Sequence, residues 1–169
     1  FLITGLLLDA HAASGRVGLV AFWGRRLRRL MPAALLAIAG IALASALVPD
    51  ISQRLRLRGD GLAALFYVAN WWLIATDAGY ADVAGAPSLV QHFWSLAVEE
   101  QFYAAFPPTV ALALWLARAR RARVAVALGA GALASWLWMA HLASAGADTM
   151  RMYFGTDTRC GELLAGAVL

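Results

Sequence analysis

The chain has 169 residues, of which 62% are hydrophobic and only 14% are charged. A soluble domain carries roughly a quarter of charged residues, so the composition favours a membrane protein. The net charge is +4, and all fourteen basic residues are arginine. The arginines cluster between apolar runs. This pattern favours cytoplasmic loops that contact lipid head groups over a surface that binds nucleic acid. The single cysteine, Cys160, excludes an internal disulfide.

The first part of the chain predicts the end of one membrane span, a loop and a second span. Residues 1–8 are apolar, residues 9–30 are polar and basic, and residues 31–49 contain no charge. A helix needs roughly 20 apolar residues to cross the bilayer core, and 31–49 supplies them. Within the loop, residues 22–30 place arginines on one side of a helix and Trp and Leu on the other. This pattern is typical of a helix at a membrane surface, and Pro32 then suits the first turn of the following span.

The second part of the chain begins with a polar connection at 50–60 and an apolar but short segment at 61–76. We expect 61–76 to be a re-entrant or tilted half-helix. A full crossing would place the basic loop at 118–123 outside, against the positive-inside rule. The remaining elements are predicted as a loop at 77–91, an apolar helix at 92–117, the basic loop at 118–123, a span at 124–144, a polar loop at 145–158 and the start of a last span at 159–169.

These elements predict an all-α fold, a polytopic transmembrane helical bundle with a single domain over residues 1–169. No repeat or second domain is visible. Both ends of the chain fall within apolar runs, and the first run lacks the charged region and cleavage site of a signal peptide. We therefore expect a fragment of a transmembrane domain that is truncated at both ends.

The most informative block lies at 92–107 and reads HFWSLAVEEQFYAAFP. In a helix, its polar residues at spacings of three, four and four share one face: His92, Ser95, Glu99 and Tyr103. Such a face suits an aqueous cavity or pairing with arginine from another helix, because a carboxylate at mid-bilayer costs several kcal/mol. Alternatively, both glutamates lie at head-group depth and solvate the helix end.

Two further blocks carry charged groups at helical spacing. Residues 22–32 read FWGRRLRRLMP. Arginines three or four residues apart present two planar guanidinium groups to one anion, which suits the phosphates of a nucleotide-bearing cofactor. The alternative is a topology anchor on acidic lipid. Residues 153–166 read YFGTDTRCGELLAG, where Asp157 and Thr158 can cap a helix and Arg159 can pair with Glu162. The sequence shows no Cys/His/Asp cluster for a metal and no Gly-rich phosphate loop.

Together these blocks resemble the acyltransferase-3 family of bacterial integral-membrane O-acyltransferases. FLITG at 1–5 resembles the end of the family's FFxLSGFLIT segment, and 22–32 resembles its FYxRRxxRixP motif. The block at 92–107 resembles HxWSLxVEEQFYxxxP, and 153–166 resembles YxxTxTRxxELLxG. Residues 64–71 also fit a hydrophobic segment of the family. The resemblance spans nearly the whole chain.

The resemblance implies an enzyme of the bacterial inner membrane that crosses it several times. It implies transfer of an acyl group, commonly acetyl, from acyl-CoA (acetyl-CoA) to a hydroxyl of a cell-envelope glycan or glycolipid. The expected partners are membrane lipids and the glycan acceptor, with neither a metal nor nucleic acid. The acceptor, the acyl chain and the oligomeric state are not set by the sequence.

Carried over by position, the family's Arg-x-x-Arg element maps onto Arg26 and Arg29, with Arg25 adjacent. These three arginines are expected to contact the CoA phosphates or to hold the donor. Glu99 and Glu100 match the family's paired glutamates and are expected to support catalysis.

The expected cavity residues of the site are His92, Ser95 and Tyr103. The family's catalytic His lies upstream of Phe1, so we expect the fragment alone to be inactive.

Two other functions compete with the acyltransferase. A non-enzymatic transporter or flippase of envelope precursors would use the polar face from His92 to Tyr103 as the lining of a pathway. A structural or sensor subunit would keep the membrane helices but would not catalyse acyl transfer. Acyl-CoA-dependent labelling of a glycan separates these functions from an acyltransferase.

Overall fold

The computed structural model describes residues 2–47, 51–76, 91–118 and 120–168. All regular elements in these ranges are helices, as predicted, and no strand occurs among them. The helices are α1 (Leu2–Ser14), α2 (Leu19–Leu47), α3 (Ile51–Leu65), α4 (Ala69–Ala75), α5 (Phe93–Leu116), α6 (Arg121–Ser144), α7 (Thr149–Phe154) and α8 (Thr156–Val168).

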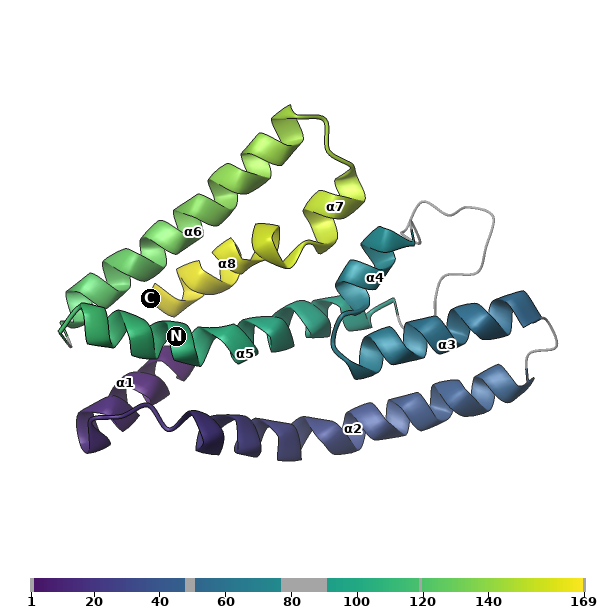
Figure 1. Cartoon of the computed structure of the whole chain (residues 1–169), viewed down its shortest axis with the longest axis horizontal. Coiled ribbons are helices and arrows are strands. Elements are labelled where there is room, and N and C mark those ends of the chain that lie inside the picture. The colour runs from purple at the N-terminus through teal and green to yellow at the C-terminus, as the bar shows by residue number, and fades with distance from the viewer. Residues whose placement is uncertain (1, 48–50, 77–90, 119, 169) are drawn as a thin grey trace.

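Two antiparallel helix pairs flank α5 (Figure 1). The long helix α2 packs along α3, and α6 packs along α8. Helix α5 contacts both pairs, and α8 lies between α6 and α5. The short helix α4 bridges α3, α5 and α7. Because α5 touches both sides, the 92–107 block occupies the centre of the fold.

The main apolar core lies where α1, α5, α6 and α8 meet. Phe106, Val110 and Leu114 of α5 are at most 3% exposed. Between helices in a membrane, such side chains stabilise the fold through close packing rather than through removal from water. The other buried members of this cluster are Leu7, Ala117, Val124, Leu128 and Ala167.

Helices α6 and α8 approach closely through small residues. The Ser135 hydroxyl donates to the carbonyl oxygen of Asp157 at 2.6 Å, and the amide of Gly161 donates to the Ser135 oxygen at 3.0 Å. A Cβ atom at Gly161 would lie 2.8 Å from Trp136 Nε1 and 3.1 Å from the backbone oxygen of Ala132. The absence of a side chain at Gly161 is therefore what permits this approach.

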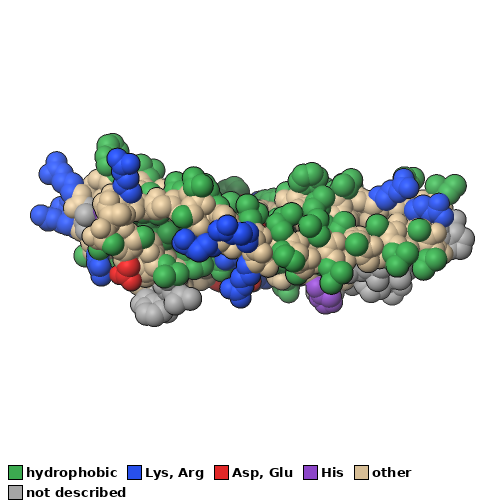
Figure 2. Space-filling model, turned by 90° about the horizontal axis from the view of Figure 1, so that it is seen from below, with side chains coloured by type: hydrophobic (Ala, Val, Ile, Leu, Met, Phe, Trp, Pro, Cys, Tyr) green, Lys and Arg blue, Asp and Glu red, His purple; other side chains and the backbone are tan. Residues whose placement is uncertain are grey.

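Two of the described helices, α2 and α6, are long and apolar enough to cross a membrane. Most of their apolar surface is not covered by protein, since Leu36 and Leu47 of α2 are 76% and 77% exposed and Val126 of α6 is 72% exposed. Figure 2 shows hydrophobic side chains along most of one face, interrupted by arginines. Large exposed apolar surfaces mark contact with a membrane or a partner, which agrees with the composition.

Three predicted boundaries are wrong. Residues 50–60 are not a polar connection, because α3 begins at Ile51, and the Arg and Leu residues there are both good helix formers. The predicted loop at 9–30 shrinks to the few residues between α1 and α2, and the loop at 145–158 contains α7. Local polarity in these segments did not exclude helix, and it did not always mean solvent exposure, since Asp60 and Thr158 are 9% and 1% exposed.

The arginine block is not a separate surface helix. Residues 22–30 form the first turns of α2, which continues through Pro32 to Leu47. Proline at this position removes one backbone donor, so the carbonyl of Arg28 loses its helical hydrogen bond. The arginines are thus rigidly joined to the apolar part of α2.

The short segment at 61–76 is broken, as its length suggested. Helix α3 ends at Leu65, and Tyr67 adopts a left-handed conformation with φ 53°. The amide of Val68 donates to Ala63 O at 2.8 Å and that of Tyr67 to Ala64 O at 3.1 Å, which is a Schellman C-cap. The seven residues of α4 rise by about 10 Å, a third of the bilayer core, so α4 does not cross it alone. The predicted loop at 77–91 lies almost entirely outside the described residues.

We predict that Gly161→Ala and Gly129→Ala change stability in opposite directions. Alanine normally stabilises a helix interior relative to glycine by about 0.5–1 kcal/mol. A Cβ at Gly129 meets nothing within 4 Å, whereas one at Gly161 meets Trp136 and the α6 backbone. Thermal unfolding of the purified protein in detergent should show a higher midpoint for Gly129→Ala and a lower one for Gly161→Ala. Equal shifts of the two variants would contradict the close α6–α8 contact.

Candidate functional site

An ion pair between α2 and α5 brings two of the predicted motifs together. Arg26 Nη2 donates to Glu100 Oε1 at 2.6 Å, and Arg26 Nε lies 2.9 Å from Oε2 and 3.1 Å from Oε1. Two guanidinium nitrogens therefore engage both carboxylate oxygens, the fork geometry that makes such pairs strong. The side chains are 25% and 12% exposed, so water screens the pair only partly.

Tyr103 also contacts the arginine of this ion pair. The Arg26 guanidinium carbon lies 3.3 Å from the centroid of the Tyr103 ring, a cation–π contact. Glu100 and Tyr103 are three residues apart on α5, so both face α2. One turn earlier on α2, Trp23 Nε1 donates to the backbone oxygen of Tyr103 at 3.2 Å. Arg26 is thus fixed by charge on one side and by an aromatic face on another.

The other predicted site residues are not part of this contact. Arg25 and Arg29 are exposed on α2, and His92, Ser95 and Glu99 are exposed on α5. Of the predicted polar face, only Tyr103 turns toward α2. Tyr103 lies between the two glutamates around the helix, about 40° from Glu99 and about 60° from Glu100. The rotation of α5 turns Glu100 and Tyr103 toward α2 and leaves Glu99 exposed. The structure therefore separates the two glutamates into one paired and one exposed carboxylate.

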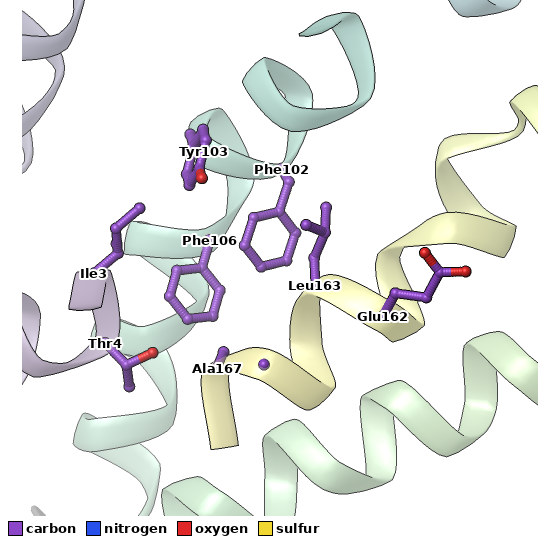
Figure 3. Close-up of a pocket in the computed structure, with 9 residues that line it drawn as sticks. Ile3, Thr4, Phe102, Tyr103, Phe106, Glu162, Leu163 and Ala167 are labelled. Carbon is purple, nitrogen blue, oxygen red and sulfur yellow. The ribbon is translucent and has the colours of Figure 1, made fainter. Parts of the chain in front are cut away.

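A cavity of about 390 Å³ adjoins Tyr103 between α1, α5 and α8. Figure 3 shows the Phe102 and Phe106 rings among the residues that line it, and the two rings stack at 4.7 Å between centroids. The lining is mostly apolar, and the Glu162 carboxylate at its edge points away from the rings. The lining residues are Ile3, Thr4, Phe102, Tyr103, Phe106, Glu162, Leu163, Gly166 and Ala167.

A second polar cluster connects α6, α7 and α8. Arg151 donates to Asp157 at 2.8 and 2.5 Å, and Trp138 Nε1 donates to Asp157 Oδ2 at 2.7 Å. Burial works to raise the pKa of Asp157, but the hydrogen bonds from Arg151 and Trp138 outweigh it and hold that pKa below the ordinary value. The predicted pairing of Arg159 with Glu162 is confirmed at 2.8 Å.

A partly buried network of amide and hydroxyl side chains was missed by the sequence analysis. It consists of Asn70 of α4, Gln101 of α5 and Thr156 of α8, joined by direct side-chain hydrogen bonds. One signal pointed to it, because Asn70 is the only asparagine in the chain and stands in an apolar segment. A polar side chain in such a segment is costly unless it has partners. Among the residues that the structure describes, no group of three His, Cys, Asp or Glu side chains could hold a metal ion.

Comparison with curated proteins finds relatives that align with the entire chain. Peptidoglycan O-acetyltransferase OatA of Listeria monocytogenes is 39% identical over 171 residues, and the chain covers 27% of that protein. YrhL of Bacillus subtilis, provisionally named a peptidoglycan O-acetyltransferase, is 40% identical over 169 residues, with 26% of its length covered. Several Staphylococcus aureus proteins, provisionally named O-acetyltransferases, are 38% identical.

The chain belongs to the same family as these O-acetyltransferases. This finding confirms the acyltransferase-3 resemblance of its motifs. The chain spans about a quarter of the length of the curated relatives that it matches. No family model matches the chain, and no solved structure matches it either.

We predict that Arg26→Ala destabilises the protein by about 1–3 kcal/mol, because Glu100 is left buried without its partner. Arg26→Lys should recover only part of this loss, since an ammonium group cannot form the fork. The exposed Arg28 provides the matched control, Arg28→Ala. The measurement is thermal unfolding in detergent, with Glu100→Gln alone and combined with Arg26→Ala as a double-mutant cycle. Equal midpoints for Arg26→Ala and Arg28→Ala would show that the ion pair does not hold α2.

We predict that Asp157→Asn lowers stability at neutral pH but not in acid. A carboxylate whose folded pKa lies below its unfolded value adds stability above the unfolded pKa and loses it as pH falls through the folded pKa. The difference from wild type, about 1 kcal/mol or less for a partly exposed pair, should therefore shrink below pH 3.8, the ordinary value. Unfolding midpoints across this range provide the measurement, and Asp9→Asn on exposed α1 surface is the control. A difference that persists below the folded pKa would contradict the assignment.

Proposed function

We propose that the protein is a membrane-bound O-acyltransferase that transfers an acyl group, acetyl in the first instance, from acyl-CoA to a hydroxyl of a cell-envelope glycan. The observation that carries the proposal is 38–40% identity along the whole chain to proteins named as O-acetyltransferases. The printed names of two relatives make peptidoglycan the first acceptor to test. A glycolipid acceptor has the same hydroxyl chemistry.

The proposed location is the bacterial inner membrane, with the chain as part of one transmembrane helical domain. The exposed leucines of α2 and the apolar length of α6 support this location. The arginine clusters at 25–29 and 118–123 are proposed to face the cytoplasm, following the positive-inside rule. Acyl-CoA is a cytoplasmic donor, so a donor site among the arginines of α2 fits this orientation.

We assign different roles to the arginines of α2. Arg26 is held by Glu100 and Tyr103 and therefore serves to fix α2 against α5. Arg25 and Arg29 are exposed and one helical turn apart, so their two guanidinium groups can reach one phosphate-bearing ligand. The CoA phosphates are the proposed ligand. This arrangement turns the predicted arginine motif into one structural anchor and two binding groups.

The reaction itself is nucleophilic acyl transfer. The sugar hydroxyl oxygen attacks the thioester carbonyl, the carbon–sulfur bond breaks, and CoA leaves as a thiolate that takes up a proton. A general base must accept the hydroxyl proton, and a His with a pKa near the working pH suits this step. The family resemblance puts that His upstream of Phe1, and we do not assign the role to the exposed His92. Glu99 remains a proposed supporting carboxylate, with Ser95 beside it on the exposed face of α5.

We predict that Arg25→Ala combined with Arg29→Ala raises KM for acetyl-CoA by about tenfold or more. Each charge-assisted hydrogen bond is worth roughly 1.5–3 kcal/mol, and tenfold corresponds to about 1.4 kcal/mol. The assay follows radiolabelled acetyl transfer to peptidoglycan in membranes of cells that express the complete gene. Arg123→Ala, another exposed arginine, should leave KM unchanged.

The outcomes separate the general proposal from the arginine assignment. Absence of acetyl-CoA-dependent labelling by the wild-type protein would refute the acyltransferase and favour a transporter or a structural subunit. Labelling with an unchanged KM in the double variant would refute only the phosphate-binding role of Arg25 and Arg29.

A further inference from the structure

We propose that the partly buried network of Asn70, Gln101 and Thr156 is a positioning element that sets the rotation of α5, so that Glu100 meets Arg26 and α2 presents its arginines to the donor. This inference rests on the proposed acyltransferase function. It adds three residues that act through the ion pair and do not touch the reacting groups.

Gln101 forms the centre of the network. Its Nε2 donates to the backbone oxygen of Tyr67 at 2.7 Å and to Asn70 Oδ1 at 2.9 Å. Its Oε1 accepts from the Thr156 hydroxyl at 2.5 Å and from Trp71 Nε1 at 3.1 Å. A primary amide offers two donors and one oxygen acceptor, and all of them are used. The side chain is therefore held in one orientation by three different segments.

Asn70 closes the network from α4. It is 0% exposed, and its Nδ2 donates to the Phe154 oxygen at 3.0 Å and to Thr156 Oγ1 at 2.9 Å. The Thr156 hydroxyl thus accepts from one amide and donates to the other. Polar groups buried in this way give less net stability than apolar packing could, yet they penalise every other register, because a shift leaves them unpaired. A single buried Asn fixes coiled-coil register by the same principle.

The network and the ion pair act on neighbouring residues of α5. Gln101 faces α4 and α8, while Glu100 faces α2. A slip of α5 by one residue translates the helix by about 1.5 Å and rotates it by about 100°. Such a slip would remove Glu100 from Arg26. Holding Gln101 therefore fixes the direction in which Glu100 points.

Tyr67 supplies a backbone acceptor to the network from the turn between α3 and α4. Its backbone oxygen accepts from Gln101 although its φ of 53° is unfavourable for a residue with a side chain. The turn between α3 and α4 therefore places the Tyr67 carbonyl oxygen where Gln101 can donate to it.

Thr156→Val tests the proposal with little change of shape, because it removes only the hydroxyl. We expect KM for acetyl-CoA to rise by about tenfold, since small misplacements of binding groups have effects of this size or larger. Thr156→Ser keeps the hydroxyl and should restore the wild-type KM. Thr109→Val, which removes a hydroxyl bonded only to its own helix at Ala105 O, should have no effect. A merely structural role would reduce the amount of active protein and lower the maximal rate, but it would leave KM unchanged.

If Thr156→Val does not accumulate in membranes, Trp71→Phe replaces it, since this change removes the indole N–H donor to Gln101 and leaves a smaller aromatic ring in contact with Arg151. KM equal to wild type in the variant that accumulates would overturn the proposal.

A second measurement does not depend on activity. Thermal unfolding of Glu100→Gln, Trp71→Phe and the double variant forms a cycle between groups that do not touch. Positioning predicts non-additive losses of the unfolding midpoint, and strictly additive losses would overturn it. If wild-type protein shows no acetyl transfer, the proposed function fails, and this cycle still decides whether the network positions Glu100.

Discussion

The fork between Arg26 and Glu100 is the interaction on which the arrangement of this protein depends. It joins the two motifs that stand furthest from ordinary membrane helix composition, one basic and one acidic. Each charge would be costly in an apolar surrounding if it stood alone, and together with the Tyr103 ring they offset that cost. Because the arginine lies on the same continuous helix as the apolar part of α2, the ion pair also sets where that helix stands.

Helix α5 is held on its two sides by different chemistry. On one side, the Glu100 carboxylate and the Tyr103 ring hold Arg26 of α2. The strength of this contact depends on the distance between the groups. On the other side, neutral amides and a hydroxyl hold α4 and α8 through directional hydrogen bonds. The apolar core of Phe106, Val110 and Leu114 lies further along α5, where this helix packs against α1, α6 and α8. Apolar packing tolerates small rotations of a helix, whereas the hydrogen bonds do not, so the polar groups define the orientation that the core then stabilises.

The exposed surfaces divide in a way that suits a membrane enzyme. Leucines and valines cover the outer faces of α2 and α6, where lipid or further helices would satisfy them. Exposed arginines lie near the start of α2, near the turn that leads into α6, and on α3 at Arg56 and Arg58. This division agrees with the proposed reaction, in which the donor is an anionic cytoplasmic molecule and the acceptor is an envelope glycan.

The sequence alone determined the helical class, the apolar segments and the blocks that carry charge. Residue composition and the spacing of apolar and polar residues along a helix are properties of a single segment, so they need no knowledge of its neighbours. Helical spacing also predicted that Arg159 would pair with Glu162, three residues away. Only the tertiary structure decided which glutamate is paired, which arginine is the anchor, and that Asn70 reaches Gln101 and Thr156, which are 31 and 86 residues away along the chain. The 3.6-residue period fixes the angles between side chains on one helix. It leaves free the rotation of each helix about its own axis relative to its neighbours, and contacts between distant segments set that rotation.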